Sequence, residues 1–262
     1  MKILIWNCRG MNKFMAVRAL QVLLERIRPD VVFLSESHLS RAKAGVLMRR
    51  FHFDEMEIHE SDGRSGGLVM WWHSSLNVTS TEVSPNFIDV RVDEHTVSAW
   101  RFTGFYGEPS ADRKHLSWQY IRDLKAMNNI PWLIGGDFND IMFGSEKEGG
   151  NIRPQRCMQL FREADDDCSL EDLGFIGEEF TWQRGRIRER LDRVFGNQDG
   201  LAMFPALGVI HEGWDKSDHR PILMDTDFYL QSQERRRPAP KRFYARWLCE
   251  ESVDTIVQAT WD

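Results

Sequence analysis

The segment Ile134-Gly135-Gly136-Asp137-Phe138-Asn139-Asp140 places a carboxylate and an amide two residues apart, directly after a short apolar run. Pro131–Ile134 has the pattern of a buried strand, and the two glycines after it allow a sharp turn. Positions i and i+2 of extended backbone point to the same side, so Asp137 and Asn139 can face one small target. A carboxylate can take a proton from water, and an amide can hold that water or a substrate oxygen.

The same residues would also suit an Asx-type turn that ends a strand and does no chemistry. The catalytic interpretation is favoured because other predicted strands are also followed by polar side chains. These side chains are Asn7, Glu36, Tyr106, Asp192, Asp218 and His219. The whole set, rather than the central segment alone, indicates an active site.

The overall composition is that of an ordinary globular protein, with 262 residues, 42% hydrophobic and 28% charged. This length suits one large α/β domain or two small ones, with ample core. The formal net charge of -6 argues against a protein that coats nucleic acid by bulk charge. An enzyme with a local basic groove and an acidic, metal-binding pocket is compatible with it.

The four cysteines, Cys8, Cys157, Cys168 and Cys249, lack the paired spacing of zinc sites or disulfide frameworks. A reducing compartment is therefore expected. The apolar run Ile3–Trp6 is too short for a signal peptide, and no run approaches transmembrane length. We expect a nuclear or cytoplasmic protein that is not secreted and does not bind a membrane.

The N-terminal segment predicts two parallel strands joined by a helix. Lys2–Trp6 and Val31–Leu34 are strand candidates, and apolar residues recur with helical spacing over Val17–Ile27 between them. Polar side chains at the ends of such strands gather in one crevice, so Asn7 and Glu36 should lie side by side. From its position alone, Glu36 could equally be an exposed loop carboxylate.

A series of strand-like runs follows, separated by turn residues, and predicts an antiparallel meander. The runs are Leu68–Trp72, Leu76–Val83, Phe87–Val92 and Val97–Phe105. The last run leads into Tyr106, which lies between two glycines. Its hydroxyl could be presented to a phosphate there, and a half-buried aromatic without a function is the alternative.

The second half of the chain again begins with a strand and a helix and continues with β-rich sequence. Beside the strand before Asp137, it predicts helices over Asp112–Met127 and Gln155–Ala164, hairpin strands over Phe180–Gln183 and Arg190–Phe195, and closing strands over Leu207–His211 and Pro221–Asp225. Asp165–Asp167 is interpreted as a solvated helix end rather than a metal cluster. The arginines near the hairpin favour a polyanion such as DNA, although a solvated hairpin would also carry them. They are Arg184, Arg186, Arg188, Arg190 and Arg193.

The composition changes after Tyr229. Gln231–Arg242 is polar, contains two prolines, and is predicted to be a linker. Apolar residues between Trp247 and Trp261 then fall on one helical face, and the chain stops in mid-pattern. We therefore divide the chain into a domain over residues 1–227 and a C-terminal region over residues 228–262, which we expect to be dispensable for catalysis and to be the front of a longer polypeptide.

Taken in order, these motifs resemble those of the endonuclease/exonuclease/phosphatase superfamily, which includes pancreatic deoxyribonuclease and the abasic-site endonucleases. The matching motifs are Trp6–Gly10, Glu36, Gly104–Gly107, Gly136–Asn139, Arg190–Arg193 and Ser217–Pro221. In finer detail, the sequence of these motifs most resembles the endonuclease domain of plant non-LTR (LINE-type) retrotransposons. That likeness lies in Thr103–Pro109, Glu146–Gly150, Phe180–Trp182 and Glu189–Arg193. The resemblance covers about residues 1–227.

The resemblance implies the deoxyribonuclease I-like fold, a four-layer α/β sandwich in which two mixed β-sheets pack face to face with helices outside. It also implies hydrolysis of phosphoesters with Mg²⁺, for which Mn²⁺ can substitute. Oxygen ligands without cysteine suit such hard cations. By residue match, Glu36 binds the metal, with Asp218 and Asn7 nearby.

The same residue match implies a role for each remaining side chain of the set. Asp137 is the base that activates water, and Asn139 orients that water. Tyr106 and His219 contact the scissile phosphate and stabilise its developing charge. Asp192 orients His219 through a carboxylate–imidazole hydrogen bond. The residues expected to bind the substrate or to support its phosphate are Thr181, Arg184, Arg186, Arg188 and Ser217.

The leading hypothesis is therefore a metal-dependent nuclease that nicks DNA as the endonuclease of a non-LTR retrotransposon. We expect a monomer, followed in the full-length protein by a reverse transcriptase, which would explain the unfinished C-terminal pattern. The alternatives are an abasic-site repair endonuclease, a phosphatase of the same superfamily, and a non-catalytic relic that only binds nucleic acid. The presence of Glu36, Asp137 and His219 argues against the relic.

Overall fold

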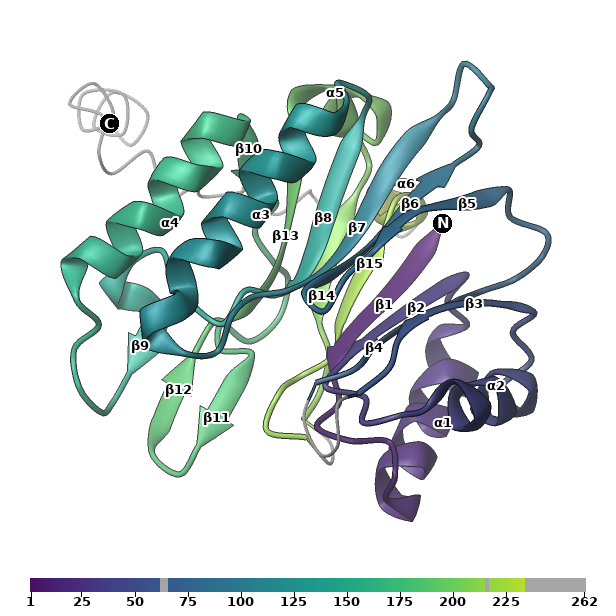
Figure 1. The fold of residues 1–262 in the computed structure, drawn as a ribbon, viewed down its shortest axis with the longest axis horizontal. Coiled ribbons are helices and arrows are strands. Elements are labelled where there is room, and N and C mark those ends of the chain that lie inside the picture. The colour runs from purple at the N-terminus through teal and green to yellow at the C-terminus, as the bar shows by residue number, and fades with distance from the viewer. Residues whose placement is uncertain (62–65, 215–216, 234–262) are drawn as a thin grey trace.

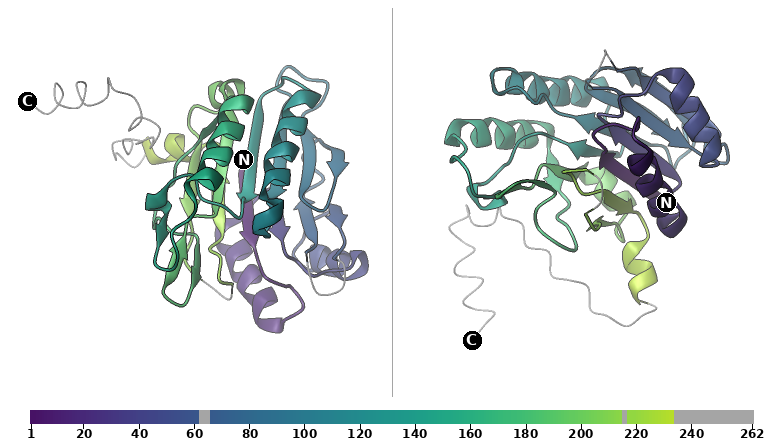
Figure 2. Two further views of the ribbon diagram at one scale, coloured as in Figure 1. Left: turned by 60° about the vertical axis from the view of Figure 1, so that its left-hand side comes forward. Right: turned by 90° about the horizontal axis from the view of Figure 1, so that it is seen from below.

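Two six-stranded mixed β-sheets lie face to face in the computed structural model, which describes residues 1–61, 66–214 and 217–233 (Figure 1). Helices α1 (Phe14–Ile27) and α2 (Arg41–Arg50) pack on the outer face of the first sheet. Helices α3 (Lys114–Met127) and α4 (Gln155–Cys168) pack on the outer face of the second. The predicted four-layer sandwich is confirmed, and the two further views in Figure 2 show the same layers.

The first sheet has β1 near its centre. In spatial order its strands are β14 (Gly208–His211), β15 (Ile222–Asp225), β1 (Lys2–Asn7), β2 (Val31–Ser35), β4 (Leu68–Trp72) and β3 (Glu55–His59). β1 is parallel to β2 and antiparallel to β15. The edge at which β1 and β2 end is therefore the edge at which β15 begins.

The second sheet has a corresponding arrangement around β8. In spatial order its strands are β10 (Leu170–Asp172), β13 (Asp192–Asn197), β8 (Trp132–Asp137), β7 (Trp100–Tyr106), β6 (Phe87–Val92) and β5 (Val78–Val83). β8 is parallel to β7 and antiparallel to β13, and its last residue, Asp137, lies opposite both Tyr106 and Asp192. The register thus brings three polar residues to one edge.

A small third sheet lies beside the sandwich. Its strands are β11 (Trp182–Arg184), β12 (Ile187–Glu189) and β9 (Lys147–Glu148). The remaining helical segments are the 3₁₀ turns Ala111–Arg113 and Gly144–Glu146 and the short helices α5 (Gln198–Met203) and α6 (Phe228–Gln233). No helix within the described ranges is both long and apolar enough to cross a membrane.

The core between the sheets forms because alternate strand residues point inward from both sides. Ile5 and Phe33 from the first sheet belong to the same buried cluster as Phe102 and Leu133 from the second. The outer layers follow helical spacing: in α1, the apolar positions from Val17 to Ile27 are buried against the first sheet. Burial of these apolar faces is the main term that stabilises the layers.

Glycines allow the two sheets to approach closely near the polar edge. A Cβ atom on Gly104 of β7 would lie 2.3 Å from the ring of Phe33 in β2. A Cβ atom on Gly135 of β8 would lie 2.7 Å from Ile5 in β1. Both separations are shorter than van der Waals contact, so a side chain at either position would push the sheets apart where the polar residues meet.

The predicted four-strand meander is correct for three strands and wrong for the first. β5, β6 and β7 are consecutive antiparallel neighbours in the second sheet, but β4 pairs with β2 and β3 in the first. Helix α2 and strand β3 were not predicted. α2 buries only Ala44 and Gly45, and β3 is an edge strand with Ile58 as its single buried residue, so neither carries a strong apolar period.

The predicted hairpin is also only partly correct. Its second strand is β12 (Ile187–Glu189), whereas Asp192–Asn197 forms β13 of the second sheet. The chain passes from the small sheet into the large one between Glu189 and Asp192, without a turn residue to signal the change. The predicted linker over 231–242 begins within α6 and otherwise, like the predicted apolar face from Trp247 to Trp261, lies outside the described residues.

Candidate active site

The polar side chains that follow the predicted strands meet at one edge of the sandwich. They are Asn7 at the end of β1, Glu36 after β2, Tyr106 at the end of β7, Asp137 at the end of β8, Asp192 at the start of β13, and Asp218 and His219 before β15. The antiparallel strands β13 and β15 begin where β8 and β1 end, so residues from six strands converge.

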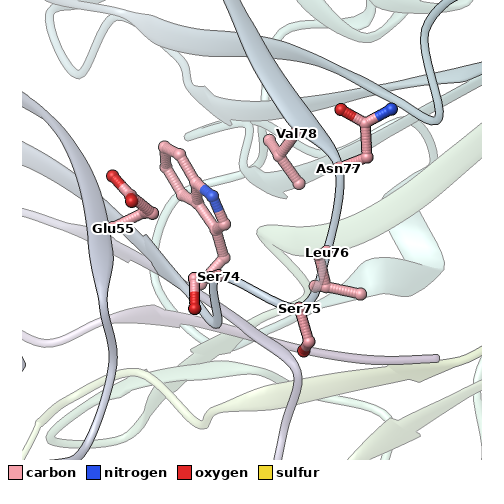
Figure 3. Close-up of a pocket in the computed structure, with 7 residues that line it drawn as sticks. Glu55, Ser74, Ser75, Leu76, Asn77 and Val78 are labelled. Carbon is pink, nitrogen blue, oxygen red and sulfur yellow. The ribbon is translucent and has the colours of Figure 1, made fainter.

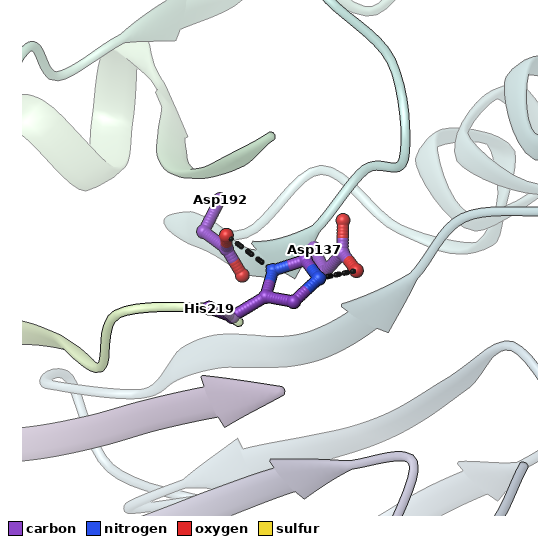
Figure 4. Close-up of side chains that lie close together, drawn as sticks. All are labelled: Asp137, Asp192 and His219. Carbon is purple, nitrogen blue, oxygen red and sulfur yellow. Dashed lines mark hydrogen bonds and ion pairs between the residues drawn. The ribbon is translucent and has the colours of Figure 1, made fainter. Parts of the chain in front are cut away.

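The deepest part of the site is a row of three buried side chains, Asp192, His219 and Asp137 (Figure 4). The Nδ1 atom of His219 lies 2.9 Å from Oδ2 of Asp192, and its Nε2 atom lies 3.6 Å from Oδ2 of Asp137. The first distance is a hydrogen bond, and the second is too long for one. The imidazole is therefore fixed by Asp192, and its Nε2 side faces Asp137 without being bonded to it.

Charge and burial set the protonation of this row. Burial alone would lower the pKa of His219, but the carboxylates of Asp192 and Asp137 outweigh it and raise the pKa to about 9. Burial raises the pKa of Asp137, and the positive charge of His219 opposes that shift. At neutral pH the row therefore holds an imidazolium between two aspartates. The carboxylate of Asp137 is more basic than that of a solvated aspartate.

Neighbouring residues hold this row in place. The hydroxyl of Ser217 accepts a hydrogen bond from the His219 backbone (3.1 Å) and donates one to the Asn7 carbonyl (2.8 Å). The indole of Trp6 donates to the His219 carbonyl (3.0 Å). Thr181 accepts from the backbone N–H of Asp192 at 2.9 Å. Ser217 and Thr181 thus hold the backbone of His219 and of Asp192, respectively, in position.

A second group, nearer the surface, surrounds Glu36. Its Oε1 atom accepts hydrogen bonds from Nδ2 of Asn7 (2.9 Å) and from the hydroxyl of Tyr106 (3.0 Å). Burial and the nearby carboxylates of Glu36 and Asp137 raise the pKa of Tyr106, so this phenol stays neutral and remains a donor. The Nε atom of Arg9 lies 3.5 Å from Oε2 of Glu36 and 3.0 Å from Oδ1 of Asp218.

Asn139 is fixed by its own backbone and side chain. It adopts a left-handed conformation (φ 55°), and its N–H donates to Oδ1 of Asp137 at 2.8 Å. Its side-chain amide donates to the Gly107 carbonyl at 2.8 Å, and its carbonyl accepts from the buried amine of Lys114. The turn therefore orients Asp137, and the amide of Asn139 lies between β7 and β8.

The hairpin arginines divide into two groups, which corrects their common interpretation as DNA contacts. Arg184 and Arg186 are exposed at the tip, and Arg188 pairs with Glu148. The other two, Arg190 and Arg193, are buried and form ion pairs with Glu146 and Asp172. These two buried arginines are part of the domain interior, Arg193 within β13 and Arg190 just before it, and they cannot reach a polyanion.

Two sets of side chains could hold a metal ion. Asp137, Asp192 and His219 offer ligand atoms within 4.8 Å of one another. A protonated imidazole has no lone pair to give, however, and Asp192 already accepts its hydrogen bond. Glu36 and Asp218 each turn one oxygen toward a shared cationic neighbour, Arg9, and suit a hard divalent cation better.

Two members of the site were not predicted to take part in it, Arg9 and Trp182. Arg9 joins Glu36 to Asp218, and the indole N–H of Trp182 donates to Oδ2 of Asp218 at 3.1 Å. Both stand inside the motifs that carried the resemblance, next to Asn7 and Thr181. That adjacency was the only sequence signal, because neither an exposed arginine nor a half-buried tryptophan indicates a role by type.

Cavities elsewhere on the molecule do not coincide with this site. One lies near the β4–β5 connection and is lined by Glu55, Trp72 and residues 74–78 (Figure 3). A second, apolar one lies between the segment after β1 and helix α2, with Met11, Leu39 and Val46 in its lining. Neither contains a residue of the polar edge.

The fold is that of the deoxyribonuclease I-like class. The Endonuclease/Exonuclease/phosphatase family matches residues 4–219, and the chain belongs to that family. It is a superfamily of nucleases and other phosphoesterases, so the chain is of a hydrolytic class. No curated protein matches the chain in a sequence search.

Solved structures with the same fold include enzymes of several kinds. The endonuclease domain of TRAS1, a telomere-specific non-LTR retrotransposon, has a TM-score of 0.63 and 16% identity, over 86% of this chain and 97% of that chain. The 3'-5' exonuclease NExo from Neisseria meningitidis has a TM-score of 0.66 and 19% identity, over 86% and 99%. The AP endonuclease LMAP from Leishmania major has a TM-score of 0.68 and 14% identity, over 85% and 86%. At these identities the likeness establishes the shared fold.

The division of the arginines predicts different effects on stability. Arg193→Met should lower the free energy of unfolding by about 3–5 kcal/mol, because it removes one of the two buried arginines that neutralise Glu146 and Asp172. Arg184→Met, at the exposed tip, should change it by no more than about 0.5 kcal/mol. Urea unfolding of the three proteins measures both values, and equal stability of the two variants would contradict the division.

The Asp192–His219 bond predicts a pH-dependent contribution to stability. Because the folded pKa of His219, about 9, exceeds its unfolded value of about 6.5, the bond stabilises fully below pH 6.5, and this stabilisation is lost as the pH rises through 9. Asp192→Asn should therefore destabilise the protein at mildly acidic pH and much less above pH 9.

The pKa of His219 itself can be followed by NMR titration of its imidazole in the parent and in Asp192→Asn. We expect a lower pKa in the variant, because the carboxylate that raises it has been removed. His211 provides an internal control, since burial first of all lowers its pKa to about 3. An unchanged His219 pKa would show that Asp192 does not set its charge.

Proposed function

We propose that this protein is a divalent-metal-dependent endonuclease that nicks DNA and is the endonuclease of a non-LTR retrotransposon. The observation that carries the proposal is the juxtaposition, at one edge, of the Asp192–His219–Asp137 row and the Glu36 group, with Asn7 bonded to both carboxylates. The first provides a base and a cation, and the second provides carboxylate oxygens for a metal.

Asp137 is the proposed general base. Burial raises its pKa, so its carboxylate attracts a proton more strongly than a solvated aspartate does. The attacking water gives its proton to Asp137, and its oxygen forms the new bond to phosphorus. The bond from phosphorus to the leaving 3′-oxygen breaks, and that oxygen takes a proton from solvent. The products are a 5′-phosphate and the free 3′-hydroxyl that a retroelement extends.

His219 and Tyr106 are the proposed donors to the phosphate. Nε2 of His219 is 3.6 Å from the nearest oxygen of Asp137, so its N–H is available to a phosphate oxygen as negative charge develops. Tyr106 remains neutral and can turn its hydroxyl from Glu36 to the same group. Asn139 holds the turn that carries Asp137, and its side-chain amide is the group proposed to orient the water.

Glu36 and Asp218, with Asn7 beside them, are the residues proposed to hold Mg²⁺ or Mn²⁺. Their donor atoms are carboxylate and amide oxygens, which hard divalent cations prefer. Such an ion, when bound, supplies Lewis-acid charge to the phosphate oxygens. Asn7 donates to Oε1 of Glu36, which leaves Oε2 for the cation.

The small sheet supports DNA as the substrate. Its tip carries Arg184 and Arg186, and its strand β11 is joined to the site through a bridge between Trp182 and His219. Some of the residues similar to those of plant retroelements also belong to this sheet, in which Lys147 of β9 pairs with Glu189 of β12. A charged hairpin beside the reaction centre can follow phosphates and groove width, which gives loose sequence preference.

The role of Asp137 predicts a large loss of turnover on its removal. Asp137→Ala should lower plasmid nicking by roughly 10²–10⁴-fold, the usual contribution of a positioned acid–base group. A folded variant that nicks at the parent rate would remove Asp137 from the proposed mechanism.

The proposed metal site predicts that plasmid nicking by the parent vanishes in excess chelator and returns with Mg²⁺ or Mn²⁺. Full activity in chelator would contradict the metal assignment.

The retroelement assignment predicts that intact duplex DNA is a good substrate. Matched duplexes with and without one abasic site should be nicked at similar rates, and the rates should fall steeply with added salt. End analysis should find a 3′-hydroxyl. Efficient cleavage restricted to the abasic duplex would favour a repair endonuclease, and release of phosphate without nicking would favour a phosphatase.

A further inference from the structure

A single nitrogen atom, Nε of Arg9, lies between the two carboxylates that are the proposed metal ligands. We propose that Arg9 is a cationic placeholder: it holds Glu36 and Asp218 together in the metal-free protein, and its side chain leaves when a divalent cation binds. Arg9 thereby weakens metal binding by competing for the same oxygens. The inference rests on the proposed metal site and specifies how this chain regulates its occupancy.

Each of the two carboxylates has one oxygen fixed by the protein and one that faces Arg9. In Glu36, Oε1 accepts from Asn7 and Tyr106, whereas Oε2 lies 3.5 Å from Nε of Arg9. In Asp218, Oδ2 accepts from Trp182, whereas Oδ1 lies 3.0 Å from the same Nε. These two oxygens, for which the described residues provide no other donor, therefore converge on one point, and a cation bound there would displace the guanidinium.

The charge balance explains why a placeholder is needed. Glu36 follows β2 and Asp218 precedes β15, so the fold brings two acidic groups together from distant parts of the chain. If no cation lay between these two carboxylates, their negative charges would repel each other and destabilise the metal-free protein. Arg9 supplies one positive charge, whereas a divalent ion supplies two and can bond both oxygens directly.

The contact of Arg9 is suited to being broken. Its side chain is 45% exposed, so the guanidinium can turn fully into water at a small cost in free energy. Oδ1 of Asp218 is buried and has no partner with hydrogen-bond geometry in the described part of the chain, so charge rather than a directed hydrogen bond holds Arg9 there. A bidentate arginine–carboxylate pair would be much harder to displace.

The backbone around Arg9 is fixed, which confines the exchange to the side chain. Arg9 and Glu36 both adopt left-handed conformations, each with φ 48°, which costs free energy in residues other than glycine. Two backbone hydrogen bonds join the loops that carry them. The N–H of Cys8 donates to the Ser35 carbonyl (3.1 Å), and the N–H of Met11 donates to the Ser37 carbonyl (2.8 Å). The strained loops thus place the guanidinium between the carboxylates in advance.

The test measures metal binding directly, without DNA. Mn²⁺ is titrated by calorimetry or electron paramagnetic resonance into the parent, Arg9→Gln, Arg9→Lys, Arg91→Gln and Glu36→Gln. Arg9→Gln, which removes the positive charge but keeps a polar side chain, should bind Mn²⁺ roughly fivefold more tightly, the equivalent of losing one competing ion pair of about 1 kcal/mol. Arg9→Lys should stay near the parent. Arg91→Gln removes a comparable pair with Glu94, remote from the site, and should have no effect.

Thermal unfolding provides a second readout in the same proteins. In chelator, Arg9→Gln should melt below the parent, because two carboxylates then face each other without a cation. Saturating Mn²⁺ should remove that difference, since the ion replaces the missing charge. A fold defect would instead lower the melting temperature under both conditions.

The outcomes separate this inference from the proposed function. Equal or weaker Mn²⁺ binding by Arg9→Gln would overturn the placeholder role while leaving the metal site intact. Unchanged Mn²⁺ binding by Glu36→Gln would show that the cation binds elsewhere, and the proposed ligand set would then fail together with this inference. Tighter binding by both Arg9→Gln and Arg91→Gln would indicate an effect of net charge alone and would also overturn it.

Discussion

One side-chain amide joins the two halves of this site. Nδ2 of Asn7 donates to Oε1 of Glu36 in the first sheet (2.9 Å) and to Oδ2 of Asp137 in the second (2.8 Å). An asparagine amide has two donor hydrogens, and both are used. The amide can reach both carboxylates only because the sheets approach closely at Gly104 and Gly135. The relative position of the Asp137 and Glu36 carboxylates therefore depends on the packing of the whole sandwich.

Two kinds of buried charge coexist in the molecule and have different tasks. Around Arg193, the positive charges of Arg190 and Arg193 neutralise Glu146 and Asp172 through short ion pairs. Burial opposes the shift, but these arginines lower the pKa of Asp172 to about 2, so that cluster is inert at physiological pH. The row through His219 is less completely paired, because Nε2 of His219 lies 3.6 Å from Oδ2 of Asp137, beyond hydrogen-bond distance. The first cluster supports β13, and β13 supplies Asp192 to the second.

Much of this arrangement follows from local sequence pattern, and the exceptions have physical causes. Buried strands that end in Asn7, Glu36 and Asp137 were predictable, because apolar runs are conspicuous and parallel strands bring their ends together. The partition of the arginines was not, because Arg188 and Arg193 look alike in sequence and differ in which sheet their backbone joins. Likewise, the contacts of Arg9 with Glu36 and Asp218 join loops that are far apart in the sequence. Local hydrophobic periodicity cannot predict such contacts.

The attachment of the small sheet also determines how readily the protein can be re-engineered. β11 is bonded to the segment that bears His219: the N–H of Gln183 donates to the Asp218 carbonyl at 2.9 Å, and the N–H of Arg220 donates to the Thr181 carbonyl at 2.7 Å. The base of the hairpin is thus inseparable from the reaction centre, whereas the tip around Gly185 has open space about it. Loops of different length can be grafted at the tip, while exchanges that extend down to Thr181 would move the histidine.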